Sequence, residues 1–146
     1  MIIRSPKTKN EFKQYYDLRW KLLRKPWKQP KRSEKDELEN QSSHIMVLED
    51  NSIIGVGRIH LNSSKEAQVR YMAVKKGLQG KGIGLKILQR LEKIAKQKNA
   101  KYVILNARES AIGFYEKQGY SVIDKAHTLF GSISHFKMRK RLNINK

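Results

Sequence analysis

Runs of apolar and β-branched residues between polar turns predict a series of short strands in the first half of the chain. Residues 44–48 and 53–61 are apolar and β-branched and flank the polar turn 49–52, which predicts a β-hairpin. Residues 67–74 have the same character and predict a third consecutive strand. The spacing then changes to a helical period over residues 83–98. The apolar stripe of this helix consists of Ile83, Ile87, Leu88, Leu91, Ile94 and Ala95. This part of the chain therefore predicts three antiparallel strands followed by one long amphipathic helix.

The remaining patterns complete the element order. Further short strands are predicted at residues 2–4, 102–105, 120–123 and 133–138. Further helices are predicted at residues 8–24, 33–38 and 109–118. A strand–helix–strand connection is parallel and right-handed, whereas hairpins are antiparallel, so the sheet should be mixed. We therefore expect a single α/β domain over residues 1–146, with a central mixed sheet of six to seven strands flanked by about four helices.

Local signals refine the ends of these elements. Two prolines within residues 25–32 interrupt the periodicity and predict a loop. Gly119 follows the helix predicted at 109–118, where a left-handed cap residue is expected. Asn106 and Glu109 have the spacing of a capping pair at the start of that helix. For Asn106, a capping role and a ligand-binding role both remain open.

Composition excludes several classes of protein. The chain has no cysteine, which removes disulfides, thiol nucleophiles and cysteine-based metal sites. Its four histidines lack the spacing of metal ligands, so no metal is expected. No apolar run approaches the roughly 18 residues of a membrane-spanning helix, and the first residues do not resemble a signal peptide. A cytoplasmic protein without a membrane partner is therefore expected.

The net charge is the unusual compositional feature. Thirty-two Lys and Arg residues oppose 13 Asp and Glu residues, a formal charge of +19. Such a field attracts RNA, DNA or phosphate-rich cofactors. The lysines are also spread along the whole chain, as on a solvated surface with heavy lysine use. Both interpretations stay open, but the charge disfavours a polycationic partner.

Residues 79–84, Gln-Gly-Lys-Gly-Ile-Gly, lie between the strand predicted at 67–74 and the helix predicted at 83–98. Alternate glycines allow a tight turn and a close approach of the backbone to a ligand. The following helix offers unpaired N–H groups and the positive end of its dipole. This combination is typical of a phosphate-binding turn. The spacing matches neither a P-loop nor the Gly-x-Gly-x-x-Gly motif of dinucleotide folds.

The Gln-x-x-Gly-x-Gly pattern resembles that of the GCN5-related N-acetyltransferase (GNAT) family. A second block, residues 105–120, resembles the family's Asn–Ala–Phe-Tyr-x-Lys-x-Gly-Tyr hallmark, and together the match covers roughly a third of the chain. The resemblance implies acetyl-CoA as cosubstrate and the GNAT-like acyl-CoA N-acyltransferase fold. The implied cofactor-binding residues are Met72, Ala73, Val74, Gln79, Gly80, Lys81, Gly82, Ile83, Gly84, Asn106, Ala111, Phe114 and Lys117. Core packing is an alternative role for Phe114.

The resemblance also implies direct acetyl transfer from the thioester to an amine, through a tetrahedral intermediate. Tyr115 would protonate the departing sulfur, and a backbone N–H near Val74 would polarise the carbonyl oxygen. Histone-type members carry a glutamate base at the position that is Gln68 here, which cannot accept a proton. Glu66, two residues earlier, is one expected catalytic alternative, and His60 and His135, the latter on the last strand, are the others. A water-relayed base, or an amine that arrives neutral, remains open.

The resemblance implies that the first two helices and their loop cover the acceptor pocket, and residues of the central strand are expected to face it as well. The expected substrate-binding residues are Arg19, Trp27, Arg70 and Tyr71, because arginines beside aromatics hold carboxylates or phosphates. The sequence thus predicts an N-acetyltransferase acting on a primary amine of a small molecule or peptide. The alternatives are acetylation of charged tRNA or a ribosomal protein, an acetyl-CoA sensor, and a non-catalytic nucleic-acid-binding module, which lacks a recognisable motif here. A homodimer is a further partner hypothesis.

Overall fold

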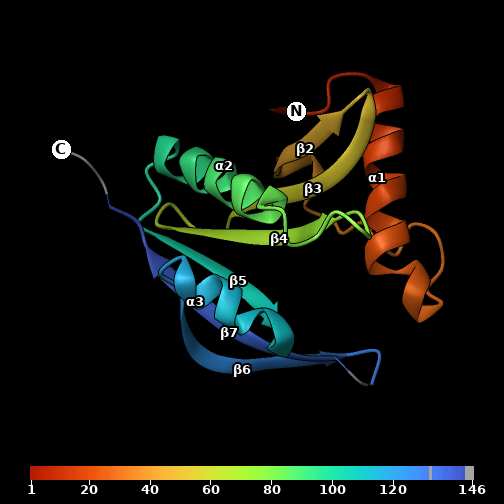
Figure 1. The fold of residues 1–146 in the computed structure, drawn as a ribbon. Helices are drawn as coiled ribbons and strands as arrows, with labels where there is room; N and C mark the ends of the chain where they lie inside the picture. The colour runs from red at the N-terminus through yellow and green to blue at the C-terminus, as the bar shows by residue number, and fades with distance from the viewer. Residues whose placement is uncertain (132, 144–146) are drawn as a thin grey trace.

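The computed structural model describes residues 1–131 and 133–143. Over these residues a seven-stranded sheet has the order β1-β2-β3-β4-β5-β7-β6 (Figure 1). The strands are β1 (Ile2–Arg4), β2 (Ser43–Glu49), β3 (Ser52–Leu61), β4 (Glu66–Val74), β5 (Tyr102–Arg108), β6 (Ser121–Leu129) and β7 (Ile133–Arg141). The helices are α1 (Lys9–Leu23), α2 (Ile83–Gln97) and α3 (Ile112–Lys117), with 3-10 turns at Lys25–Trp27, Glu39–Gln41 and Glu109–Ala111. Among the described strands only β4 and β5 pair in parallel, so the predicted mixed α/β sheet is confirmed.

The prediction of a helix at residues 33–38 is wrong, because these residues form turns. Its acidic side chains bond to nearby backbone N–H groups: Glu34 accepts from the N–H of Arg32 at 2.7 Å, and Asp36 accepts from the N–H of Leu38 at 2.9 Å. Such local bonds hold turns instead of a helix. The described residues therefore contain three α-helices, one fewer than expected, and a single 3-10 turn follows at Glu39–Gln41.

The last two strands are longer than the sequence pattern indicated. β6 extends to Leu129 and β7 to Arg141, beyond the predicted ends at 123 and 138. β6 is an edge strand, and its residues 121–125 are all exposed. Without a buried face, this strand carries little of the alternation on which a strand prediction depends.

The two faces of the sheet are covered by different helices. Neighbouring residues of β2 point to opposite sides: Val47 packs in the core beneath α2, whereas Met46 packs with Tyr15 of α1. α2 lies unusually close to β3, because a Cβ on Gly57 would come within 2.6 Å of the Ile87 side chain. The fully buried Ile87 contributes roughly 1.5–3 kcal/mol of burial free energy. The predicted apolar stripe of residues 83–98 is thus the surface that fixes α2 on the sheet.

β4 and β5 meet at one end only. They pair from Glu66 to Gln68 against Tyr102 to Ile104, and then diverge towards their C-terminal ends (Figure 1). The register of β3 against β4 shifts between Val56 and Arg58, which places one extra residue in β4. At this bulge Tyr71 has a φ of 53°, an uncommon left-handed conformation for a non-glycine residue. The splay leaves the β5-facing edge of β4 open at the centre of the sheet.

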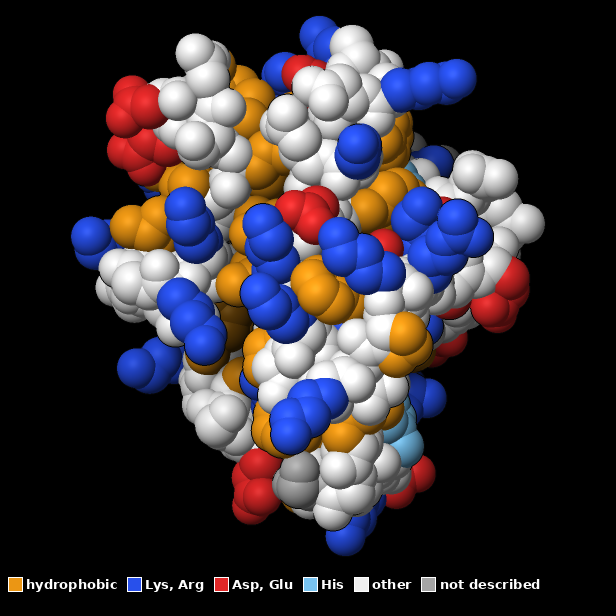
Figure 2. Space-filling view, turned by 90° about the vertical axis from the view of Figure 1, so that its right-hand side faces the viewer, with side chains coloured by type: hydrophobic (Ala, Val, Ile, Leu, Met, Phe, Trp, Pro, Cys, Tyr) orange, Lys and Arg blue, Asp and Glu red, His pale blue; other side chains and the backbone are white. Residues whose placement is uncertain are grey.

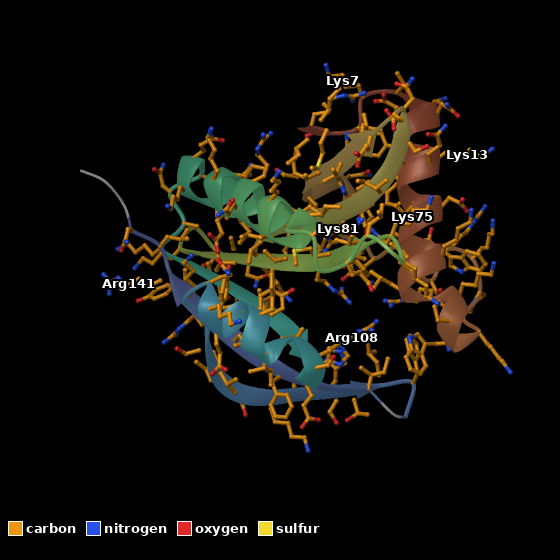
Figure 3. The ribbon with its side chains drawn as sticks, in the orientation of Figure 1. Lys7, Lys13, Lys75, Lys81, Arg108 and Arg141 are labelled. Atoms are coloured by element: carbon orange, nitrogen blue, oxygen red, sulfur yellow. The ribbon has the colours of Figure 1, made fainter. Side chains whose placement is uncertain are left out.

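Basic side chains are spread over the side of the molecule towards which β4 and β5 diverge (Figure 2). Lys75 and Lys81 lie near the turn before α2, and Arg108 lies at the end of β5 (Figure 3). None of the helices in the described residues is both long and apolar enough to cross a membrane.

Candidate functional site

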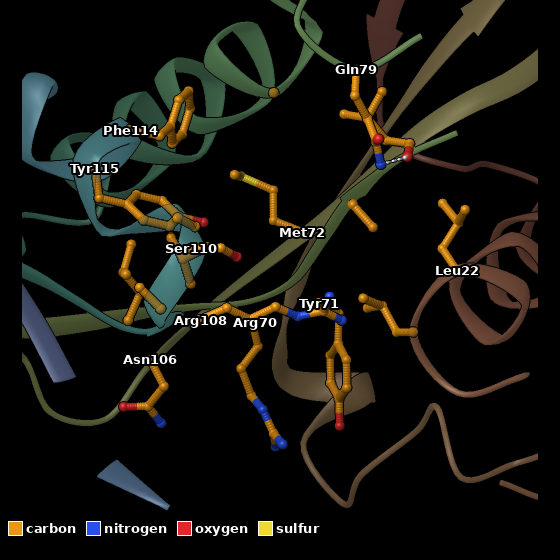
Figure 4. A pocket seen from close by; sticks show the side chains of 18 of the residues that line it. Leu22, Arg70, Tyr71, Met72, Gln79, Asn106, Arg108, Ser110, Phe114 and Tyr115 are labelled. Atoms are coloured by element: carbon orange, nitrogen blue, oxygen red, sulfur yellow. Dashed lines mark hydrogen bonds between the residues drawn. The ribbon is translucent and has the colours of Figure 1, made fainter. Parts of the chain in front are cut away.

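The splay between β4 and β5 opens into a cavity of about 1010 Å³. This volume lies at the upper end of the roughly 300–1,000 Å³ typical of ligand sites. Its walls come from the end of α1 and the following turn, the diverging halves of β4 and β5, the turn before α2, α3, and the ends of β6 and β7. Segments predicted from both sequence motifs therefore line one cavity (Figure 4).

The glycine-rich turn forms one wall of this cavity, through Gln79, Gly80, Gly82 and Gly84. Gly80 and Gly82 have φ angles of 80° and 82°, and no atom lies within 4 Å of a Cβ built on either. α2 begins directly after Gly82, and no side chain caps it. The first N–H groups of α2 are therefore open to an anion, with no side chain in the way. The chemistry of this turn fits a diphosphate.

The open edge of β4 forms the second wall, with Met72, Ala73 and Val74 lining the cavity. Beyond Gln68, β4 has no pairing partner on its β5 side among the described residues. The main-chain groups on this edge can therefore pair with an extended ligand, as an added strand would. The bulge at Tyr71 changes the direction of this edge just before Met72.

The third wall comes from α3 and the end of β5. Phe114 and Tyr115 extend from α3, and the phenol of Tyr115 points towards Met72 on β4 (Figure 4). Burial raises the pKa of Tyr115 to about 12. This phenol therefore keeps its proton at neutral pH and is able to act as a proton donor. Phe114 also packs against the core, so its two expected roles coexist.

Asn106 lines the cavity from β5. The expected capping role for its side chain is wrong, since neither the turn at Glu109–Ala111 nor α3 has a side-chain cap bond. The left-handed cap at Gly119 is confirmed by its φ of 96°. Asn106 therefore remains free for contact with a ligand.

Two stacked imidazoles form part of the cavity lining. His135 on β7 and His127 on β6 have ring centroids 4.9 Å apart and an interplanar angle of 15°. Nδ1 of His135 lies 3.0 Å from the carbonyl oxygen of Ile133, which identifies Nδ1 as the protonated nitrogen of the neutral ring. Burial lowers the pKa of His135, with smaller contributions from the positive charge of neighbouring groups. His135 is therefore neutral at neutral pH, with Nε2 able to accept a proton.

The loop before β2 is tied to the sheet by two carboxylates. Asp36 accepts from Arg58 at 2.6 Å and from Arg70 at 2.7 Å, and Glu39 accepts from Arg58 at 2.7 Å and from Arg19 at 2.9 Å. Burial disfavours ionised Asp36, but hydrogen bonds and attraction from the arginines outweigh it and lower its pKa. This network holds Arg70 at the cavity wall.

Three of the four residues predicted to bind the acceptor line the cavity, and one does not. Trp27, Arg70 and Tyr71 line the cavity, and Trp27 stacks on Phe130. Arg19 does not: it is fully buried, with its guanidinium 4.3 Å from the centroid of the Tyr71 ring. Arg19 therefore packs against Tyr71, a residue of the lining, without lining the cavity itself.

Four other predicted residues also lie outside the cavity lining. Glu66 sits where β4 and β5 are still paired, and its carboxylate accepts from the amide of Asn62 at 3.3 Å. It therefore lies at the paired end of β4 and β5, outside the cavity lining. Lys81 and Lys117 are exposed, and the Ile83 side chain is buried in the core. Only the main chain of Ile83 remains available to a ligand.

Several lining residues were missed by the sequence reasoning. Arg108 is the last residue of β5 and Ser110 lies two residues further on, so the position of Asn106 could have indicated them. His127 and Leu129 were missed because β6 was predicted to end at residue 123. No group of three or more His, Asp or Glu side chains in the described ranges is arranged to hold a metal ion.

Comparison with known proteins gives a consistent result. Residues 12–120 match the model of the acetyltransferase (GNAT) family. The chain is 33% identical over 134 residues to the uncharacterized N-acetyltransferase YjcF of Bacillus subtilis, covering 92% of this chain and 95% of YjcF. It also resembles the solved structure of an acyl-CoA N-acyltransferase from Pseudomonas aeruginosa, with a TM-score of 0.82, 18% identity, and coverage of 95% of this chain and 97% of that one.

A GNAT acetyltransferase from Elizabethkingia anophelis, solved with acetyl-CoA bound, is also similar in fold. The TM-score is 0.78, with 18% identity and 97% of each chain covered. At this level of identity, the two solved structures support an assignment of the fold alone. They confirm the GNAT-like fold expected from the sequence.

Proposed function

Because the chain belongs to the acetyltransferase (GNAT) family, we propose that it moves the acetyl group of acetyl-CoA to a primary amine of a small molecule or peptide. The family assignment and the class of enzyme expected from the sequence are confirmed by the family match and by YjcF. The identity of the acceptor and the roles of individual residues are the new part of the proposal.

One observation carries the proposal. The uncapped start of α2, the open edge of β4 and the phenol of Tyr115 line the same cavity. The amides after Gly80 and Gly82 suit the diphosphate of acetyl-CoA, and the β4 edge from Met72 to Val74 suits its extended pantetheine arm. That arm would lead the thioester from the glycine turn towards α3. The solved relative that binds acetyl-CoA is consistent with this donor.

The donor supplies an acetyl group activated as a thioester. The amine nitrogen forms the new bond to the carbonyl carbon, the carbon–sulfur bond breaks, and the amine loses a proton. A main-chain N–H of the segment Met72 to Val74 would stabilise the negative charge that develops on the carbonyl oxygen. The phenol of Tyr115 would donate its proton to the departing sulfur, since its raised pKa keeps it protonated.

His135 is the proposed acceptor of the amine proton. It lies in the cavity lining, its Nε2 is the unprotonated nitrogen, and its lowered pKa keeps the ring neutral at neutral pH. Glu66 is not proposed as the base because it lies outside the cavity lining. His127, stacked on His135, would act as a positioning residue.

Calorimetric titration with acetyl-CoA, followed by an assay of CoA release with a panel of amines, tests the proposal. We expect one binding site for acetyl-CoA and amine-dependent release of CoA. A thermal-shift comparison of CoA with RNA oligonucleotides at two salt concentrations separates the alternative of a nucleic-acid-binding module. A module of that kind would be stabilised by RNA with a steep salt dependence and left unchanged by CoA. Binding of acetyl-CoA without release in the presence of any amine would favour the sensor alternative.

A further inference from the structure

The charges in the cavity lining are of one sign. The lining contains the cationic side chains of Arg24, Arg70, Lys76 and Arg108. Within the part of the chain that the structure describes, the lining contains no aspartate or glutamate. Lys76 lies two residues beyond β4, near the glycine turn, where the donor's phosphates are proposed to bind. Arg24 directly follows α1, and Arg70 lies in β4.

Arg24 is a partly buried cation without a counter-ion among the described residues. Its Nε donates to the carbonyl oxygen of Ser33 at 3.0 Å, and its Nη1 donates to that of Leu23 at 3.1 Å. Both partners are neutral. Burial, reinforced by the nearby positive charge of Arg70, lowers the pKa of Arg24. A desolvated guanidinium in this position is stabilised by an anion that enters the cavity.

Tyr71 marks the centre of this basic region. The guanidinium carbons of Arg19, Arg58, Arg70 and Arg24 lie 4.3, 5.0, 4.5 and 5.7 Å from the centroid of its ring. Only Asp36 and Glu39 form ion pairs with these four arginines within the described ranges. Arg19 and Arg58 are fully buried, whereas the side chain of Arg70 is 39% exposed and faces the cavity.

The guanidinium of Arg70 has N–H donors that are not used within the described residues. Its Nη1 is bonded to Asp36, and no bond to a described residue is formed by its Nη2 or Nε. A guanidinium with two free donors can bind a carboxylate or phosphate oxygen in a fixed geometry. Arg70 thus offers free donors, and Arg24 adds a positive charge that has no counter-ion among the described residues.

We propose that the acceptor is an amine that also carries an oxyanion, a carboxylate or a phosphate, which Arg24 and Arg70 bind while the amine faces the acetyl group. This inference rests on the proposed acetyl transfer and adds the chemical class of its substrate. Polyamines and other polycationic amines are excluded as good substrates, since no carboxylate in the described lining could balance their charge.

The same cations assist the chemistry. Positive charge near an ammonium group favours its neutral form, which is the form that attacks the thioester. The oxyanion anchors the acceptor, and the surrounding arginines prevent the amine from being held as an ion pair. This reduces the demand on a general base at the position where Gln68 replaces the glutamate of histone-type members.

Matched pairs of amines test the inference. The pairs are phosphoethanolamine with ethanolamine and glycine with glycinamide, and spermidine is the polycationic member. CoA release is measured in the presence of saturating acetyl-CoA, and binding to the CoA-loaded protein is measured by calorimetry. We expect the anionic member of at least one pair to exceed its neutral partner by about tenfold or more in kcat/KM or in affinity. The pair that responds distinguishes a phosphate from a carboxylate.

Arginine variants connect the preference to the site. Arg70→Gln and Arg24→Gln should raise KM or Kd for the anionic amine about tenfold, and leave the affinity for acetyl-CoA unchanged. Arg139→Gln, an exposed arginine of β7 outside the lining, is the matched control and should change neither. Both arginines are partly buried, and Arg70→Gln keeps the test valid if Arg24→Gln does not fold.

Equal or better use of the neutral or cationic members would overturn the inference while leaving acetyl transfer intact. Absence of both turnover and millimolar binding for every anionic member would also overturn it. Failure of the protein to bind acetyl-CoA at all would instead contradict the proposed function, and calorimetry with the donor alone detects that outcome separately.

Discussion

Asp36 and Arg70 are 34 residues apart in the chain and form an ion pair of 2.7 Å between Oδ2 and Nη1. The other carboxylate oxygen of Asp36 accepts from Nη1 of the fully buried Arg58. One carboxylate therefore links an irregular loop, the centre of β3 and the wall of the cavity. The orientation of Arg70 depends on a residue that the cavity itself does not contain.

Replacement Asp36→Asn should destabilise the fold by about 1–3 kcal/mol at neutral pH, because Arg58 and Arg70 lose a charged partner. The pKa of Asp36 is lowered in the folded protein, so its stabilisation is present above the unfolded pKa of about 3.9 and is lost as the pH falls through the folded value. Urea unfolding at neutral pH and at about pH 3 should show the difference between Asp36→Asn and wild type shrinking. Asp124→Asn, on the exposed part of β6, is the control and should be near neutral.

The glycine turn allows a matched pair of variants. Gly82→Ala and Gly77→Ala place a Cβ at similar φ angles, 82° and 86°, and neither Cβ meets an atom within 4 Å. Each should cost about 1 kcal/mol of stability through backbone strain. Only Gly82 lines the cavity, so Gly82→Ala should weaken CoA binding about tenfold or more, whereas Gly77→Ala should leave it unchanged. Equal CoA affinities in calorimetry would remove the turn from the proposed diphosphate site.

Tyr115→Phe removes only the phenolic proton donor. We expect turnover to fall by roughly ten- to a thousandfold, with little change in the affinity for acetyl-CoA. The ring still packs beside Phe114 and Tyr120, so the thermal stability should change little. Steady-state kinetics together with calorimetry measure both quantities. A variant with wild-type turnover would show that the sulfur leaves without help from this residue.

His135 should set the acid limb of the pH–rate profile. Its lowered pKa places that limb below the usual value of 6.5, with activity lost as the pH falls and the ring becomes protonated. His135→Gln should lower turnover by about 10²-fold or more and remove this limb.

His127→Gln is the companion variant for this profile. It should retain most of the rate and move the limb to higher pH, because positive charge on His127 contributes to lowering the pKa of His135. An unchanged acid limb in His135→Gln would assign the proton transfer to another group or to water.

Much of the fold followed from the sequence because its strongest patterns lie in buried elements. α2 has one buried stripe, the hairpin β2–β3 is buried on both faces, and both elements were placed within a few residues. The short helix predicted at 33–38 failed because Glu34 and Asp36 bond to nearby backbone groups, a competition that helix periodicity does not record. β6 was shortened because its exposed residues carry no alternation.

For the site, the motif residues Gly80, Gly82 and Tyr115 were found because their types and spacing are specific. The acceptor wall depends on long-range packing: Arg19 is buried behind Tyr71, whereas Arg24 reaches the cavity. Only the three-dimensional arrangement shows that the cavity lining, over the described residues, contains no carboxylate. The homodimer, the cytoplasmic location and the nucleic-acid contact stay predictions.

A crystal structure of the acetyl-CoA complex measures the central claim most directly, through the distance between the thioester sulfur and the Tyr115 hydroxyl oxygen. The account predicts the diphosphate on the amides of residues 79–84, the pantetheine arm along Met72 to Val74, and the sulfur within about 3–3.5 Å of the hydroxyl. Acetyl-CoA bound elsewhere, or a thioester turned away from Tyr115 with the glycine turn closed by neighbouring side chains, would contradict it.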